Sequence, residues 1–207
     1  MGSVPKEKNN MTRFRPLQIH HLHVDSRLTY FDNGLPVHVS VNDSALKVMT
    51  DLRRVPAVTV HPDLTVDAAL QRMVHAGVRM LFVVDAMGDL VGMVTARDLM
   101  GEKPVRIAAR EQVQRDQVQI GDIMIRRGQI EVLDFAEVQR SSVGDLVQTM
   151  KQMGRQHALV EEKDQQPCVR GVFSLSQIAR QLGVQIETGG AVQSFSELEQ
   201  LLVDHES

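Results

Sequence analysis

An internal repeat constrains the fold of this chain more than any other feature. Apolar residues at helical spacing run from Thr65 to Gly77, and the same pattern returns from Ser142 to Gly154, 77 residues later (142 against 65). Each segment ends at a glycine suited to a left-handed C-cap. The pattern therefore predicts two copies of one unit built around an amphipathic helix.

The segments around the two helices repeat as well. A β-prone stretch precedes each helix, at residues 57–60 and 129–133. Two β-prone runs and a short helix follow it, at residues 81–84, 90–94 and 96–100 in the first copy and 158–160, 168–173 and 175–182 in the second. Each copy therefore reads strand, helix, strand, strand, helix. A unit of ~60 residues buries little surface alone, so we expect the two copies to pack together.

The repeat divides the 207 residues into five parts. We predict an N-terminal arm and extended segment over residues 1–43, a first unit over 44–103, a helical connector over 104–119, a second unit over 120–183, and a C-terminal tail over 184–207. The tail carries a short amphipathic helix around residues 195–203.

Composition excludes several classes of protein. Apolar residues are 43% and charged residues 24%, as in soluble globular proteins, and no apolar run approaches the ~18–20 residues that span a bilayer. The net charge of −3 argues against nucleic acid as the main partner. Cys168 is the only cysteine, which excludes an intramolecular disulfide, and residues 1–10 lack the apolar stretch of a secretory signal. We therefore expect a cytoplasmic protein without a membrane partner.

A short motif ends each pair of β-prone runs. It reads Gly92-Met-Val-Thr95-Ala-Arg-Asp98 in the first copy and Gly171-Val-Phe-Ser174-Leu-Ser-Gln177 in the second. With the repeat around it, this motif resembles that of CBS domains: glycine, two apolar residues, Thr or Ser, two variable residues, Asp. The chain resembles a stand-alone, bacterial-type tandem CBS pair, or Bateman module, over about residues 44–183. The resemblance implies an α/β fold in which two CBS repeats pack through their sheets about a pseudo-two-fold axis.

The chemistry of the motif suits a nucleotide. An N-cap hydroxyl beside the free N–H groups of a first helical turn favours anions, and a carboxylate in that turn can accept both hydrogen bonds of a ribose diol. The resemblance carries these roles onto Thr95, facing phosphates, and Asp98, holding the ribose of an adenine nucleotide. It also makes Arg79 a phosphate ligand. The adenine would lie among Thr59, Val78 and Met80.

The second copy departs from the motif. Gln177 replaces the acid and Gln156 replaces the arginine, with His157 as the nearest cationic candidate, whereas Ser174 keeps the hydroxyl. A neutral hydrogen bond contributes ~0.5–1.5 kcal/mol against ~1.5–3 kcal/mol for a charge-assisted one. We therefore predict one competent pocket per chain and a weaker second pocket of His157, Ser174 and Gln177.

Simpler explanations stand beside these. Thr95 and Asp98 could form only a helix cap, which contributes ~0.5–2 kcal/mol. His20, His21 and His23 raise the possibility of zinc, but they lack a carboxylate or cysteine at ligand spacing, so we predict no metal site. The chain contains no GxSxG, GxGxxG, Walker A or HExxH motif, and we predict that it is not an enzyme.

The sequence therefore predicts a regulatory module that senses an adenosine-containing ligand in the cleft between its two CBS repeats. AMP, ADP or ATP is favoured over S-adenosylmethionine as the regulatory ligand, with no catalytic cofactor, and the bound state would signal to an unidentified effector protein. The alternative is a ligand-free scaffold or interaction protein with the CBS fold. Apolar helix residues such as Val66, Leu70 and Met73 need cover beyond one chain, which predicts a homodimer.

Overall fold

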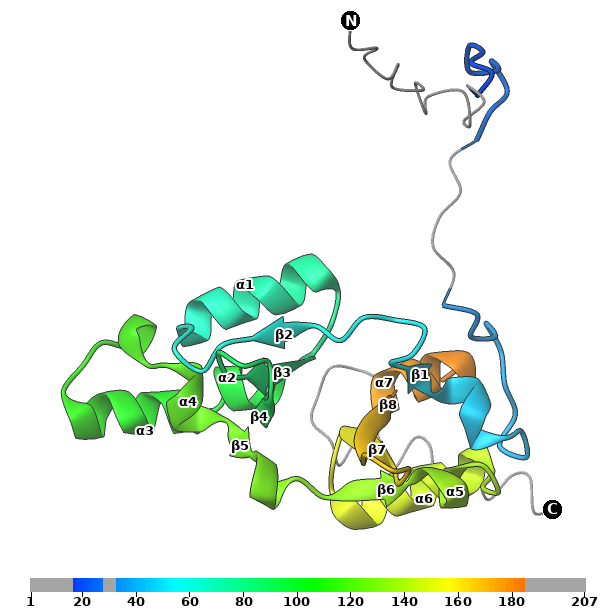
Figure 1. Cartoon of the computed structure of the whole chain (residues 1–207). Helices are drawn as coiled ribbons and strands as arrows, with labels where there is room; N and C mark the ends of the chain where they lie inside the picture. The colour runs from blue at the N-terminus through cyan, green and yellow to red at the C-terminus, as the bar shows by residue number, and fades with distance from the viewer. Residues whose placement is uncertain (1–16, 28–32, 185–207) are drawn as a thin grey trace, which may run out of the picture. The chain divides into compact units, whose positions relative to one another are not determined.

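A computed structural model describes residues 17–27 and 33–184 (Figure 1). The chain divides into two units, Met1–Asp32 and Asn33–Ser207. In the first unit, residues 17–27 are exposed and contain one turn, in which the Ser26 amide donates to the His23 carbonyl at 3.0 Å. The predicted arm over residues 1–16 and the predicted helix at 195–203 lie outside the described residues.

The second unit is built on two four-stranded sheets. The first has the order β2 (Thr59–Val60), β3 (Met80–Val84), β4 (Leu90–Thr95), β5 (Ile125–Arg126), and the second the order β1 (Thr50–Asp51), β8 (Cys168–Ser174), β7 (His157–Glu162), β6 (Val132–Asp134). In each sheet one pair of strands is parallel, β2 with β3 and β6 with β7, and the other pairs are antiparallel. The predicted α/β fold with two repeated units is confirmed.

Two long helices mark the repeat, α1 (Val66–Ala76) and α6 (Val143–Met153). Their N-caps are Thr65 and Ser142, whose hydroxyls accept hydrogen bonds from first-turn amides. Both helices end at a glycine in the left-handed conformation, with φ of 64° at Gly77 and 62° at Gly154. The glycine ends are those that the sequence predicted, and the hydroxyl N-caps follow from the same kind of local chemistry.

Shorter helices complete the second unit. They are α2 (Ala96–Met100), α3 (Glu102–Glu111), α4 (Ile120–Ile123), α5 (Phe135–Val138) and α7 (Leu175–Gln181), with 3-10 turns η2 (Ala45–Val48), η3 (Arg115–Gln117) and η4 (Arg127–Gln129). The segment between the repeats is partly helical, through α3 and η3. Across residues 17–27 and 33–184, no helix combines the length and apolar character needed to cross a membrane.

The two repeats exchange their first strands. β1 belongs to the first repeat in sequence but pairs with β8, with Thr50 opposite Val172. β5 belongs to the second repeat in sequence but pairs with β4, with Ile125 opposite Met93. The starts of the two repeats in the sequence, at residues 44 and 120, stay predictions. In space the repeats are interlocked, and the exchange is what makes their relation two-fold.

The glycine of each motif lies where an exchanged strand crosses its new sheet. A Cβ atom on Gly92 would lie 2.6 Å from the Ile125 carbonyl oxygen, and one on Gly171 would lie 2.6 Å from the Met49 sulfur. Real Cβ atoms do not approach other atoms this closely. Glycine therefore serves here to admit a neighbouring backbone.

Three buried clusters hold the repeats together. The first surrounds α1 and its sheet and includes Ile120 and Ile123 from α4. The second surrounds α6 and its sheet and includes Ala45 and Val48 from η2. The third lies between the sheets, which therefore pack face to face, and consists of Met80, Phe82, Met93 and Leu159.

One predicted surface is wrong. Val66 and Met73 are buried in the core of their own repeat and Leu70 is half-buried against it, so they do not form an exposed apolar face. The helical spacing identified the face correctly, but the sheet of the same repeat covers it. The exposed apolar side chain on α1 is Val74, at 69% exposure.

Candidate functional site

Thr95 and Asp98 form a capping box at the N-terminus of α2. The Thr95 amide and hydroxyl donate to Asp98 Oδ2 at 2.9 and 2.6 Å, and the Thr95 hydroxyl oxygen accepts from the Asp98 amide at 3.3 Å. Both side chains are half-buried. The reciprocal bonds fix the position of both functional groups.

The same box occurs at the N-terminus of α6. The Ser142 amide and hydroxyl donate to Asp145 Oδ2 at 2.8 and 2.7 Å. Hydrogen bonds from the Ser142 side chain and amide lower the pKa of Asp145. The box is therefore a structural element that this chain uses more than once, and only the surroundings of Thr95 and Asp98 distinguish them.

A pocket of about 230 Å³ lies between the repeats beside the α2 capping box. The polar side chains lining it come from the end of β4 and α2, and from the start of β7 and the turn before it: Thr95, Arg97, Asp98, Arg155, Gln156 and His157. Met93 and Ile125 supply apolar wall. The pocket thus combines groups from both repeats, and the exchanged strand β5 forms part of it.

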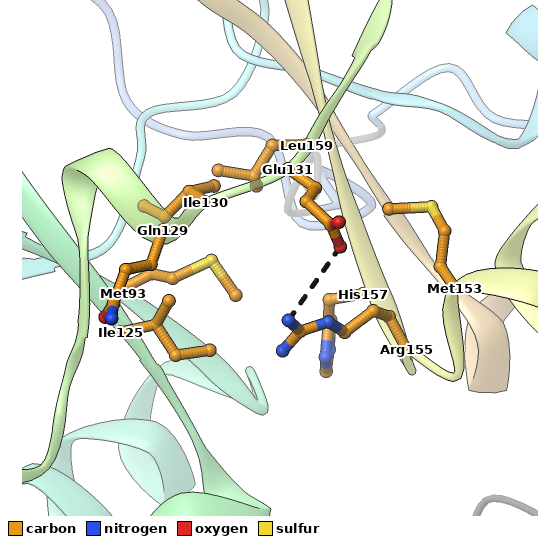
Figure 2. A pocket seen from close by; sticks show the side chains of 9 residues that line it. All are labelled: Met93, Ile125, Gln129, Ile130, Glu131, Met153, Arg155, His157 and Leu159. Carbon is orange, nitrogen blue, oxygen red and sulfur yellow. Dashed lines mark ion pairs between the residues drawn. The ribbon is translucent and has the colours of Figure 1, made fainter.

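A narrower pocket shares this wall. It is lined in part by Met93, Ile125, Arg155 and His157 (Figure 2). In Figure 2, Met93 and Ile125 lie across the open space from Arg155 and His157. An ion pair of 3.9 Å joins Arg155 Nη2 to Glu131 Oε2 at its rim. Among residues 17–27 and 33–184, the carboxylate partner of Arg155 is this distant and exposed Glu131.

His157 is electrostatically unusual. Its ring is half-buried, and its buried Nδ1 atom has no hydrogen-bond partner among the described residues. Burial and the nearby positive charge of Arg79 lower the pKa of His157 to about 4, opposed by the negative charge of Asp98. The imidazole is therefore neutral at physiological pH.

The structure groups the predicted residues differently from the sequence. It brings His157 into the pocket of Thr95 and Asp98, whereas the sequence grouped His157 with Ser174 and Gln177. The Ser174 hydroxyl lies 3.1 Å from that of Ser176, and Gln177 Oε1 accepts from the Thr50 hydroxyl at 3.5 Å. The reason is the two-fold relation, since the turn before β7 faces the α2 helix of the other repeat.

The remaining predicted residues lie outside this pocket. Thr59 lines a separate open pocket of about 490 Å³, together with His61, Asp63 and Arg72. Met80 is buried between the sheets, and Val78 packs against the core of the first repeat. Arg79 is exposed but close enough for its charge to act on His157. Ile125 and Met93, rather than Val78 and Met80, provide the apolar wall beside Asp98.

Sequence reasoning missed Arg155. This arginine aligns with Val78 at the repeat interval of 77 (155 against 78), one position before the glutamine that replaces Arg79. Allowing the basic residue to shift by one position would have found it. The histidines at 20, 21 and 23 belong to the described part of the chain, in which no three His, Cys, Asp or Glu side chains are placed to hold a metal ion.

Comparison with known proteins identifies the repeat. Residues 45–104 match the sequence model of the CBS domain. An uncharacterized protein from Methanopyrus kandleri is 35% identical over 65 residues, which are 31% of this chain and 33% of that protein. The chain thus spans about a third of that relative's length. Residues 45–104 are therefore similar to a CBS domain.

Most of the second unit is similar to solved structures. An uncharacterized conserved protein from Pyrococcus horikoshii superposes with a TM-score of 0.52 at 21% identity, over 73% of this chain and all (100%) of that one. CBSX2, a CBS-pair protein from Arabidopsis thaliana, has a structure in complex with AMP, with a TM-score of 0.46 at 20% identity over 67% of this chain and 94% of that one. The second unit therefore shares the fold of the Pyrococcus horikoshii protein.

Proposed function

We propose that this chain is a regulatory module that binds an adenosine-containing anion, namely AMP, ADP or ATP, between its CBS repeats. The observation that carries the proposal is the pocket of about 230 Å³ lined by Asp98 from one repeat and by Arg155 and His157 from the other. Its volume lies slightly below the ~300–1,000 Å³ of pockets that enclose drug-sized ligands, which suits a nucleotide with part of its surface outside.

Each polar group has a distinct role in this proposal. An ionised carboxylate accepts up to about four hydrogen bonds, so Asp98 can hold ribose hydroxyls while its Oδ2 atom still receives both bonds from Thr95. The guanidinium groups of Arg97 and Arg155 suit phosphate oxygens. They also repel a cationic ligand. S-adenosylmethionine carries a positively charged sulfonium, so we expect it to bind more weakly than the nucleotides.

The second repeat carries the residues of the proposed weaker site. Ser174 and Gln177 stand where Thr95 and Asp98 stand in the first repeat, and Gln177 already bonds to Thr50 and to Gln181, at 3.5 and 3.4 Å. A neutral amide with these partners offers the ribose no charge-assisted bond. We therefore propose one principal pocket per chain.

Regulation follows from the position of the pocket. A ligand that touches Asp98 of one repeat and Arg155 of the other stabilises the arrangement of repeats that brings them together, and it shifts the population of states by its differential affinity. The proposal assigns binding to this pocket and no reaction. The nucleotide acts as a regulatory ligand, and an unidentified effector protein reads the bound state.

A thermal-shift panel tests the proposal. ADP should raise the melting temperature of the protein, because a ligand at about 100 times its Kd stabilises the native state by about 2.7 kcal/mol. In Asp98→Asn the affinity for ADP should fall about ten-fold, from the loss of about 1–2 kcal/mol when a charge-assisted bond becomes neutral. The shift at a fixed ADP concentration should therefore be smaller in this variant.

Asp145→Asn is the matched control. It removes the same carboxylate from the same kind of capping box, on α6 and among residues that do not line the pocket. Its basal melting temperature should fall like that of Asp98→Asn, but its response to ADP should equal that of the wild type. A flat response of the wild type to AMP, ADP, ATP and S-adenosylmethionine at millimolar concentration would support the ligand-free scaffold instead.

We further propose that the protein is a homodimer. Large apolar side chains are exposed on consecutive helices of the first repeat and the connector: Val74 on α1 at 69% exposure, Met100 on α2 at 65% and Val105 on α3 at 57%. Met100 and Val105 line an open pocket of about 490 Å³. Surface of this kind on consecutive helices is typical of an interface.

Sedimentation at micromolar concentration should show a dimer of the 23.1 kDa chain. Met100→Lys should shift the population towards monomer, because it places a charge in the apolar surface. Met87→Lys is the control, since Met87 is also exposed but lies in the turn between β3 and β4. A monomer in the wild type, or equal effects of the two substitutions, would contradict this surface.

A further inference from the structure

The position of His157 has an apolar counterpart in the first repeat. Met80 begins β3 and pairs with Thr95, and His157 begins β7 and pairs with Ser174, the equivalent residue of the second motif. Met80 is buried in the apolar cluster between the sheets. The fold therefore accepts a thioether at this strand position, and packing alone does not require an imidazole.

The imidazole leaves a polar atom unsatisfied in the free protein. His157 Nδ1 is buried without a hydrogen-bond partner among the described residues, while the ring lines both pockets described above. Buried polar atoms in folded proteins are paired in the great majority of cases, and an orphan at a pocket calls for a ligand atom or a water. Its place in the pocket thus marks His157 as a recognition residue.

Charged residues from four segments act on the His157 ring or line the same pockets. They are Arg79 before β3, Arg97 and Asp98 on α2, Glu131 before β6 and Arg155 before β7. In the free protein, burial and Arg79 outweigh Asp98 and keep the ring neutral, with a pKa of about 4. A phosphate group beside Arg155 would oppose the positive charges and favour the imidazolium.

We propose that His157 takes up a proton when a phosphate-bearing ligand enters this pocket, so that the chain binds such ligands more tightly as the pH falls. The inference rests on the proposed function, since it concerns the same pocket. The bound protein then holds more protons than the free protein, and linkage makes the Kd fall with falling pH. For a single proton the limit is about ten-fold in affinity per pH unit.

Calorimetric titration with ADP at about pH 6, in two buffers with different heats of ionisation, measures the proton uptake. Because the terminal phosphate of ADP also titrates, with a pKa near 6, the measured quantity is the difference between the wild type and His157→Met. The wild type should take up more protons than the variant. The ratio of Kd at pH 7 to Kd at pH 6 should be several-fold larger in the wild type.

The free proteins provide a second measurement. In the wild type the unfolded state carries a proton on His157 between about pH 4 and pH 6.5 that the folded state lacks, so stability falls as the pH is lowered through this window. His157→Met removes this term, and its melting temperature should fall less on acidification. His157→Gln, which keeps a polar group that does not titrate, replaces His157→Met if the methionine variant does not fold.

The outcomes separate this inference from the proposed function. If wild type and variant both bind ADP with equal proton uptake, the role of His157 is overturned and the proposed function stands. If the wild type binds no ADP at either pH, both are overturned. Greater uptake by the wild type, absent from both His157 variants, supports the inference.

Discussion

Replacing Arg170 with alanine should lower the free energy of unfolding by about 3 kcal/mol, the lower end of the ~3–5 kcal/mol that loss of one partner from a buried ion pair costs. The Arg170 side chain is 13% exposed and joins two carboxylates, with Nη1 2.6 Å from Asp51 and Nε 3.2 Å from Glu162. Its guanidinium also lies over the Phe135 ring at 4.9 Å. The alanine variant leaves both carboxylates without this cation.

The effect should be large because of where Asp51 lies. It belongs to the exchanged strand β1, which contributes only two residues to its sheet, so the ion pair is a main anchor of that strand. Loss of this ion pair therefore weakens the pairing of β1 with the sheet of the other repeat, in addition to removing the ion pair itself. Urea unfolding with a two-state fit measures the change.

Arg53→Ala is the matched control. Arg53 binds the same Glu162 at 2.6 Å, but its side chain is 59% exposed, and ion pairs at such positions contribute ~0–1 kcal/mol. Similar losses in the two variants would show that the Arg170 network behaves as a surface network and does not anchor the exchanged strand.

The parts of the fold that local chemistry controls were accessible from the sequence. α1 and α6 end at the predicted glycines, because capping depends on a residue and its near neighbours. The strands β3 and β4 fall within one residue of their predicted ranges, since buried strands of five or six residues carry a strong apolar signal.

Strand exchange was not accessible in the same way. β1 and β5 have two residues each, too few to show a period, and their partners lie more than a hundred and about thirty residues away in sequence. The sequence signal that does report them is indirect: the glycines Gly92 and Gly171, which admit the crossing strands. The motif glycines are visible in the sequence, but the need for glycine at these positions becomes clear only from the tertiary structure.

Which of the candidate residues share a pocket depends on the tertiary structure for the same reason. The sequence assigns pocket residues copy by copy, whereas the two-fold arrangement builds a pocket from α2 of one repeat and the turn before β7 of the other. His157 therefore faces Asp98, and Thr59 lies in another pocket. Thr95 and Asp98 do cap α2, as the simpler explanation predicted. Both hydrogen bonds from Thr95 go to Asp98 Oδ2, so the Oδ1 atom is available to a ligand.

Gly92→Ala should destabilise the protein by about 1–3 kcal/mol or more, the usual cost of forcing a methyl group into a packed interior. The new Cβ would meet the Ile125 carbonyl oxygen at 2.6 Å and the Met124 sulfur at 2.8 Å. A carbonyl within a paired strand moves only if the strand moves. Gly171→Ala should cost less, because its nearest obstacle is the flexible Met49 side chain, at 2.6 Å, with the Thr50 carbonyl at 3.1 Å.

Gly128→Ala is the control for these two substitutions. Gly128 lies in η4, shortly after β5, and its φ is not positive. A Cβ atom there would meet no other atom within 4 Å, so alanine should be neutral or stabilising by about 0.4–1 kcal/mol. Chemical denaturation should rank the losses Gly92→Ala, then Gly171→Ala, then Gly128→Ala. Equal losses at Gly92 and Gly128 would show that entropy of the unfolded chain, and not the crossing strand, sets the effect.

The Gly92 substitution should also reach the pocket. Displacing β5 moves Ile125, which lines the pocket beside Asp98, whereas displacing β1 through Gly171→Ala acts in the other sheet. The affinity for ADP should therefore fall more in Gly92→Ala than in Gly171→Ala, even at temperatures where both variants are folded. Calorimetric titration under such conditions decides this, and an unchanged Kd in Gly92→Ala would mean that the wall formed by Ile125 does not contact the ligand.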